Sequence, residues 1–259
     1  MDKASFGGVV LAVVGIIAGL LLEGGNLGQI FQPTAALIVF GGTLGAVLLQ
    51  FPLKTVLDAI RRLAHVFFHS SEQNQQLIET LVAFANKARR SGVVSLDGDL
   101  EKIDEPFLRQ ALTLAVDGTE PAELRKIMLL TMDSRAEGED RIPAVFESAG
   151  GFSPTVGILG AVLGLIQVMQ HLEDINEVGK GIAVAFVATI YGVASANLLF
   201  LPWAGKLRIR LRERQIVQEM TLEAVLSIIE GVNPRALELQ LGSYLTVPQK
   251  RGQLKVASR

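Results

Sequence analysis

The sequence has no cysteine, and aromatic residues make up only 6% of it. Without cysteine, neither a disulfide framework nor a thiolate metal site can form. Two of the three histidines, His65 and His69, stand four residues apart, and we interpret this spacing as chance placement on a surface rather than a metal site. We therefore expect neither a metal nor another cofactor.

Motifs for nucleotide or acyl chemistry are also missing. No glycine-rich loop is followed by Lys-Ser or Lys-Thr, so direct use of ATP is not expected. The stretch 151–155 superficially matches a nucleophile elbow but lacks its closing glycine. No basic tract is interleaved with aromatic residues, as nucleic-acid binding would favour. We therefore expect a protein that is not an enzyme and does not bind nucleic acid.

Charge is absent from four long apolar runs, although 19% of all residues are charged. Each run reaches roughly the 17–25 residues that a membrane-spanning helix needs, and the mean hydropathy of the chain is +0.40. The sequence therefore predicts an all-α, polytopic membrane protein with four transmembrane helices and a helical cytoplasmic domain. The four runs are Phe6–Leu22, Thr34–Phe51, Phe152–Met169 and Gly181–Trp203.

Lysine and arginine gather at one end of these runs, which indicates the orientation of the chain. The loop 23–33 contains neither residue, and the loop 170–180 contains a single lysine. Both termini and the long segment 52–151 are therefore predicted to be cytoplasmic. The basic residues that follow the second and fourth runs are Lys54, Arg61, Arg62, Lys206, Arg208, Arg210, Arg212 and Arg214.

The segments outside the apolar runs have the pattern of amphipathic helices. We expect helices over 73–92 and 105–118, each closed by a glycine, and over 119–138 with Thr119 as the N-cap. The helix that follows the fourth run is expected to reach about Glu230, before Asn233-Pro234 breaks it. The chain thus divides into a first helix pair, a cytoplasmic domain, a second helix pair and a C-terminal helix with its tail, at 1–51, 52–151, 152–203 and 204–259.

All four apolar runs contain small residues spaced four apart, which places them on one helix face and lets neighbouring helices approach closely. This spacing fits packing within the chain, and small residues on further faces of the third and fourth runs favour contacts with other chains as well. The pairs are Gly15 with Gly19, Gly41 with Gly45, Gly160 with Gly164, and Ala188 with Gly192.

The missing charge leaves two possibilities for transport, since ion pathways through lipid normally need an ionisable group. Either the protein moves no ion, or another subunit supplies the carboxylate. Thr189 could then lie beside that carboxylate, or its hydroxyl could simply bond to the carbonyl four residues earlier.

Prolines stand near one end of the third and of the fourth run. Pro154 fits the first turn of a helix that Ser153 caps. Pro202 lies inside an apparently continuous helix, so we expect the carbonyl of Leu198 to lose its partner and the helix to kink. Such a kink serves either coupling or a simple bend.

Several segments, in order along nearly the whole chain, resemble the MotA stator subunits of the bacterial flagellar motor. This resemblance implies a multi-pass protein of the bacterial inner membrane that converts ion flow into torque. It also implies a homopentamer around MotB, a single-span subunit that binds peptidoglycan. The matching segments include "GGTLGAVLLQFP", "LAVDGTEPAELRKIM", "PTVGILGAVLGLI", "AFVATIYG" and "EAVLSIIEGVNPRALELQL".

The resemblance also assigns roles to residues of the third and fourth runs. Pro154 and Pro202 match prolines that the family associates with conformational coupling to ion flow. Thr189 matches the threonine that faces the ion-carrying aspartate of MotB. Sodium-driven relatives carry a threonine where this chain has Ala161, and sodium needs several oxygen ligands, so proton coupling is predicted.

In the cytoplasmic segment, "ARRSGVVSLDGDLE" resembles the stretch that engages the rotor protein FliG. Arg89 best matches the family's arginine, with Arg90 as a substitute, and Asp97 stands where a glutamate is usual; all three could equally be solvated. The main alternative is an ExbB- or TolQ-type energiser of an outer-membrane system, which lacks such an N-terminal helix pair. A structural membrane scaffold without ion flux is a further alternative.

Overall fold

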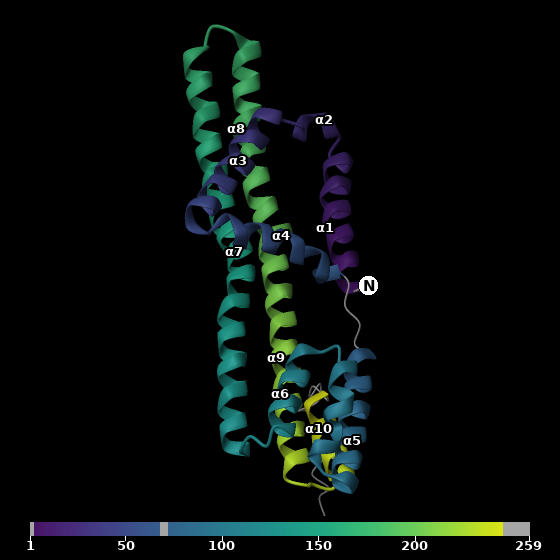
Figure 1. Ribbon diagram of the computed structural model, residues 1–259. Coiled ribbons are helices and arrows are strands. Elements are labelled where there is room, and N and C mark those ends of the chain that lie inside the picture. Colours follow the sequence, from purple (N-terminus) through teal and green to yellow (C-terminus); the bar gives the residue numbers. More distant parts are fainter. Residues whose placement is uncertain (1–2, 68–71, 246–259) are drawn as a thin grey trace, which may run out of the picture. The chain divides into compact units, whose positions relative to one another are not determined.

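A computed structural model of the chain describes residues 3–67 and 72–245, and these residues form helices without a strand (Figure 1). The all-α prediction is therefore confirmed. The helices are α1 (Lys3–Leu22), α2 (Leu27–Ile30), α3 (Pro33–Gln50), α4 (Leu53–Phe67), α5 (Glu72–Ser91), the 3₁₀-helix η1 (Val93–Lys102), α6 (Pro106–Val116), α7 (Pro121–Gln170), α8 (Ile175–Ser195), the π-turn η2 (Ala196–Phe200), α9 (Leu201–Ile229) and α10 (Pro234–Leu245).

The helices separate into two compact units. The first unit combines the N-terminal helices up to α4 with residues 137–211, and the second combines 72–136 with 212–245. The long helices α7 and α9 therefore contribute to both units. The proposed four-part division of the chain stays a prediction, because it describes placement in a membrane rather than packing.

Apolar helices are present where the sequence predicts them. The helix α3 and stretches of α7 and of α8 with its continuation are long and apolar enough to cross a membrane. The N-terminal helix α1 is apolar over its described stretch Gly7–Leu22. In Figure 1, α1 stands apart from the hairpin formed by α7 and α8, and it contacts mainly α2 and α4.

Several helix ends lie at the expected residues because glycine adopts the left-handed conformation that closes a helix. Gly92 follows α5 and Gly118 follows α6, and both have a φ of +79°. Glu105 caps α6 by accepting a hydrogen bond from the backbone N–H of Leu108. The predicted cap Thr119 is one residue early, because α7 begins at Pro121 and the N–H of Leu124 bonds to the carbonyl of Glu120.

The sequence-based boundary within α7 is wrong. The expected helix 119–138 and the third apolar run form one helix, with Pro143 and Pro154 inside it. Ser153 therefore does not cap a helix; its side chain is fully buried. A proline inside a long helix removes only one backbone hydrogen bond, and packing on both sides holds the remaining turns together.

The helix also continues through Pro202, as predicted, but its preceding turn is wider than an α-turn. In η2 the N–H of Leu201 donates to the carbonyl of Ala196, five residues earlier. Because a proline has no N–H, a wider turn beside it accommodates the missing hydrogen bond without ending the helix.

Each unit has its own buried cluster. In the second unit, large apolar side chains from α5, α6, α7, α9 and α10 form one core, with Phe107 and Leu81 fully buried. In the first unit, α3 buries one stripe of residues spaced four apart, which packs against α8 at Ala35 and Val39 and against α4, α7 and α9 at Val47. The stripe consists of Ala35, Val39, Thr43 and Val47.

Candidate functional site

The helices α7 and α8 meet along a seam of small residues. A Cβ atom added to Gly192 would lie 2.6 Å from the carbonyl oxygen of Ser153, and one added to Gly157 would lie 2.9 Å from that of Ala188. Such atoms cannot fit, so the two backbones are in direct contact. The predicted close packing is therefore confirmed for the Gly160–Gly164 and Ala188–Gly192 pairs.

The other small-residue pairs behave differently. Cβ atoms added to Gly15, Gly19, Gly41 and Gly45 would meet nothing within 4 Å among the described residues. These glycines on α1 and α3 thus face space that the described chain leaves open.

Thr189 lies half-buried on an otherwise apolar stripe of α8. Its hydroxyl donates to the carbonyl of Ala185 at 3.1 Å, which is the local bond that helical threonines commonly form. This bond uses the single proton and leaves the oxygen free to accept another. The neighbours of Thr189 on this stripe are apolar and exposed: Ile182, Phe186 and Val193.

Three of the four predicted ion-path residues come from the same seam. A Cβ added to Gly192 would lie 3.3 Å from the Cα of Pro154. Further along, a Cβ added to Gly160 would lie 2.8 Å from that of Ala188, and Ala161 and Thr189 are the next residues in the chain. The seam therefore brings the helix turns of Pro154, Ala161 and Thr189 together.

Pro202 belongs to a different place, two residues beyond the end of η2. The next residue, Trp203, packs edge-on against Phe146 and Phe200, with ring centroids 5.9 Å and 6.1 Å apart. These rings join a buried cluster that also includes Val56 and Ala59 of α4. Pro202 is thus adjacent to the packing of α4, α7 and α9 rather than to Thr189.

The predicted rotor-facing residues lie on the second unit and are all exposed. Arg89 and Arg90 occupy the last turn of α5, where positive charge is favourable at the C-terminal end of the helix. Asp97 lies on η1, beyond the helix that the sequence predicts over 73–92. The three residues therefore present charge of both signs to solvent.

Two ion pairs near these residues involve Asp99, which the sequence analysis missed. Its carboxylate bonds to Lys87 at 2.6 Å and to Lys102 at 3.3 Å. These two hydrogen bonds lower the pKa of Asp99 below its ordinary value. The three-residue spacing of Asp99 and Lys102 was readable in the sequence, whereas the contact with α5 depends on how η1 folds back.

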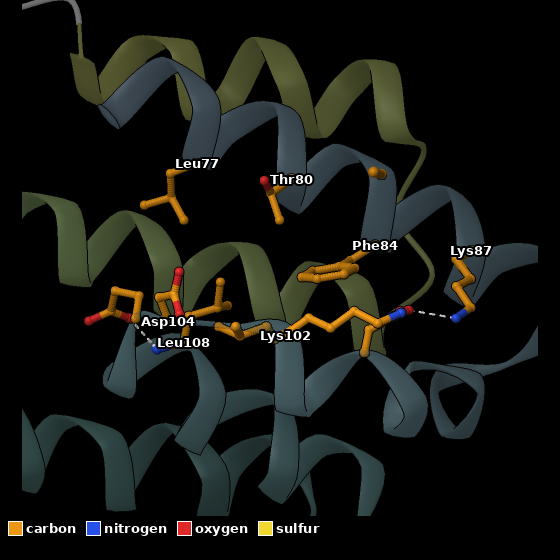
Figure 2. Close-up of a pocket in the computed structure, with 11 residues that line it drawn as sticks. Leu77, Thr80, Phe84, Lys87, Lys102, Asp104 and Leu108 are labelled. Carbon is orange, nitrogen blue, oxygen red and sulfur yellow. Dashed lines mark hydrogen bonds and ion pairs between the residues drawn. The ribbon is translucent and has the colours of Figure 1, made fainter. Parts of the chain in front are cut away.

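An open hollow of about 420 Å³ lies between α5 and the start of α6. Figure 2 shows Phe84 near its middle, Lys87 at one end and Asp104 toward the other. The hollow adjoins the turn of Arg89 and Arg90 but includes neither residue nor Asp97. In the described part of the chain, no cluster of three potential metal ligands occurs; the side chains of His65 and His69 lie outside that part.

Two family models match consecutive regions of the chain. Residues 99–220 match the model of the MotA/TolQ/ExbB proton channel family, and residues 6–92 match that of the motility protein A N-terminal region. Motility protein A of Bacillus subtilis is 35% identical over 247 residues, which cover 95% of this chain and 91% of that protein. The chain belongs to the MotA/TolQ/ExbB proton channel family.

Other members of the MotA/TolQ/ExbB family agree with this result. Chemotaxis protein PomA of Vibrio alginolyticus is 30% identical over 249 residues, with 95% of this chain and 96% of that protein covered. The MotAB structure from C. jejuni superposes with a TM-score of 0.89 at 32% identity, covering 98% of this chain and all of that one. The flagellar MotAB stator complex from Bacillus subtilis gives 0.85 at 35% identity, covering 94% and 96%.

Within the family, these relatives identify the chain as a flagellar stator subunit of the motility protein A type. The match over 6–92 distinguishes it from ExbB- and TolQ-type members, which were the main alternative. The predicted recognition, fold and motility function are therefore confirmed, whereas the roles of individual residues stay predictions.

Proposed function

We propose that this chain conducts protons together with a MotB-like, single-span subunit that binds peptidoglycan, and that the flow drives a rotor. The uncharged apolar runs require the ion-carrying carboxylate to come from that partner. The observation that carries the proposal is Thr189, the polar member of an exposed apolar stripe on α8. Its hydroxyl oxygen can accept a further hydrogen bond, and a partner helix would lie on this stripe.

The open small-residue faces of α1 and α3 support assembly with further copies of the chain and with lipid. The resemblance to stator subunits supports a homopentamer in the bacterial inner membrane. The distribution of basic residues supports cytoplasmic positions for both termini. Arg89, Arg90 and Asp97 would then face the rotor protein FliG. Pro154 and Pro202 would transmit conformational change along α7 and α9.

The proposal of proton coupling rests on three residues near Thr189 that have no side-chain oxygen atom. Sodium loses its water only where several oxygen ligands replace it, and Ala161, Ala188 and Gly160 offer no side-chain oxygen beside Thr189. A proton needs only the carboxylate. One elementary charge crossing about 100 mV releases roughly 2.3 kcal/mol, enough to bias conformational steps without a nucleotide.

The test measures swimming speed in cells whose only stator is this chain with its native partner. Speed should not depend on external sodium and should collapse with a protonophore. Thr189→Ala should slow swimming and lower proton flux while the chain and its partner remain assembled in the membrane. Thr155→Ala is the matched control, because the Thr155 hydroxyl bonds only within α7.

Two outcomes would contradict the proposal. A saturating dependence of speed on sodium at fixed membrane potential would exclude proton coupling. Normal speed and flux in Thr189→Ala would remove Thr189 from the ion path. Loss of assembly in that variant would instead assign Thr189 a packing role.

A further inference from the structure

Side-chain hydrogen bonds join different helices at only two places among α7, α8 and the link before α3, within the described residues. At one place, the hydroxyl of Tyr191 donates to the carbonyl of Ile30 and accepts from the N–H of Gln32 at 3.3 Å. At the other, the hydroxyls of Ser153 and Ser195 are 2.6 Å apart. Tyr191 and Ser195 are one helical turn apart on α8.

The direction of the serine bond follows from its surroundings. The Ser195 hydroxyl donates its single proton to the carbonyl of Tyr191, at 2.6 Å. Ser153 must therefore donate to the oxygen of Ser195. Both serine side chains are buried, 0% and 4% exposed, beside the contact of Gly192 with the backbone of Ser153 and Pro154. Hydrogen bonds thus run from Ser153 of α7 through the Ser195 hydroxyl to the backbone carbonyl of Tyr191 on α8.

The Tyr191 hydroxyl forms hydrogen bonds with two backbone groups that have no partner in a helix. Phe31 and Gln32 are extended, so neither the carbonyl of Ile30, the last residue of α2, nor the Gln32 N–H can bond within a continuing helix. Cβ atoms added to Gly42 and Gly160 would contact Val156 and Ile38, so α3 and α7 run antiparallel with these residues level.

By the same spacing, the start of α3 lies level with about residue 165 of α7, which continues to Gln170. The link before α3 therefore lies beside apolar surface, where an unpaired backbone group is costly.

We propose that Tyr191 and Ser195, with Ile30, Gln32 and Ser153, form a polar clamp that positions α8 and hence Thr189 for the ion path. The clamp holds α8 to the first helix pair on one side and to the proline-containing turn of α7 on the other. Tyr191 and Ser195 are positioning residues and touch no ion. The inference rests on the proposed function, because it concerns the helix that faces the partner carboxylate.

The first test measures geometry without motility. Because the chain has no cysteine, a Ser153→Cys/Ser195→Cys variant, expressed with its native partner, reports the contact directly through an intramolecular disulfide formed in membranes under a lipid-permeable oxidant. We expect efficient disulfide formation, and Thr155→Cys/Ser195→Cys as the control should form little. Equal yields in both variants would overturn the serine contact. This readout stays valid even if the proposed function fails.

The second test measures positioning. Tyr191→Phe keeps the ring and its contact with Phe40, whose centroid is 6.0 Å away, but removes both hydrogen bonds. If the free energy that favours the aligned position of α8 falls by about 1 kcal/mol, the aligned population relative to the rest falls about fivefold. We therefore expect proton flux and swimming speed to fall by up to about fivefold, with membrane level and partner binding unchanged.

A purely structural role would not shift the pH dependence of speed, whereas misplacement of Thr189 beside the partner carboxylate should. We expect Tyr191→Phe and Ser195→Ala each to shift the cytoplasmic pH of half-maximal speed, and Ser195→Thr to restore it. The double variant should be worse than either single one, because the two contacts hold α8 on different sides. Unchanged speed and pH profiles in Tyr191→Phe and Ser195→Ala would overturn the proposal.

Discussion

In the second unit the largest apolar side chains are the most deeply buried, whereas in the apolar helices of the first unit they face outward. Phe107 and Leu124 are 0% exposed, while Phe186 on α8 is 69% exposed. Along the seam of α7 and α8, the buried residues are instead small ones such as Gly192 and Gly157. Water drives large apolar groups inward, but lipid is no less apolar than they are, so helices in the first unit gain stability through close backbone contact.

The outer surfaces differ in the same way. Around the second unit, the exposed positions include charged residues such as Arg89, Arg90 and Asp97. Around the seam of α7 and α8, they are leucine, isoleucine and valine, including Leu163 and Ile166. One chain therefore follows two packing rules, and each substitution should show which rule governs its position.

The largest effect should come from filling the seam. Gly192→Leu places a side chain where even a Cβ lies 2.6 Å from the backbone oxygen of Ser153. We expect α7 and α8 to separate, with loss of swimming and of the assembled complex in membrane extracts. Gly15→Leu, at a position with nothing within 4 Å in the described chain, should leave the seam intact. Equal damage would show that α1 packs as tightly against another molecule.

A slightly smaller effect is expected from emptying the core of the second unit. Phe107→Ala should destabilise that unit by about 3–5 kcal/mol, because it creates a buried cavity. Limited proteolysis of the assembled complex should then cut the second unit first. Phe186→Ala removes the same group from an exposed position and should not change protease resistance; if it does, another chain covers that side chain.

A moderate effect is expected from reversing the charges on the outside of the second unit. Arg89→Glu combined with Asp97→Lys should lower torque without changing the folding of the unit, and reversed charges on the rotor should restore part of it. Single neutral changes should be mild, since exposed pairs contribute on the order of 0.2–1 kcal/mol. Arg235→Glu on α10 is the control, and a panel of rotor reversals without rescue would leave these residues as solvated surface.

The smallest effect concerns the ion pairs of Asp99. Hydrogen bonds from Lys87 and Lys102 hold the pKa of Asp99 below its unfolded value, so the folded unit is stabilised when the carboxylate is charged. This contribution is present above the unfolded pKa and is lost as the pH falls through the folded one. Asp99→Asn should lower the melting temperature slightly at pH 7, and the difference should vanish in acid. Asp97→Asn on the same 3₁₀-helix is the matched control, because it leaves the bonds of Lys87 and Lys102 to Asp99 in place.

Much of this organisation could be predicted because it depends on local chemistry. Uncharged apolar runs require lipid, and Gly92 and Gly118 end helices through their own backbone freedom. Asn233-Pro234 separates α9 from α10 for a similarly local reason. None of these features needs knowledge of what packs against them.

The misjudged features depend on partners distant in the sequence. Pro154 was expected to open a helix, yet contact with α8 at Gly192 keeps α7 continuous there. Ser153 was read as a cap, although its partner Ser195 is 42 residues away. The hydrogen bonds of the Tyr191 hydroxyl leave no periodic pattern in the sequence, because they join backbone groups of Ile30 and Gln32 that lie about 160 residues away. The fold class was thus predictable, and the contacts that join the helices were not.

Trp203 is the only tryptophan in the sequence, and this gives the molecule an intrinsic optical probe. Its indole ring lies among Phe146 and Phe200 in the buried cluster beside η2 and Pro202. Its N–H is buried and meets no acceptor among the described residues. Emission from this indole should therefore be blue-shifted, and it should move to longer wavelength if the wide turn rearranges and admits water. The emission wavelength of the unlabelled chain therefore reports rearrangement of the turn beside Pro202 as it happens.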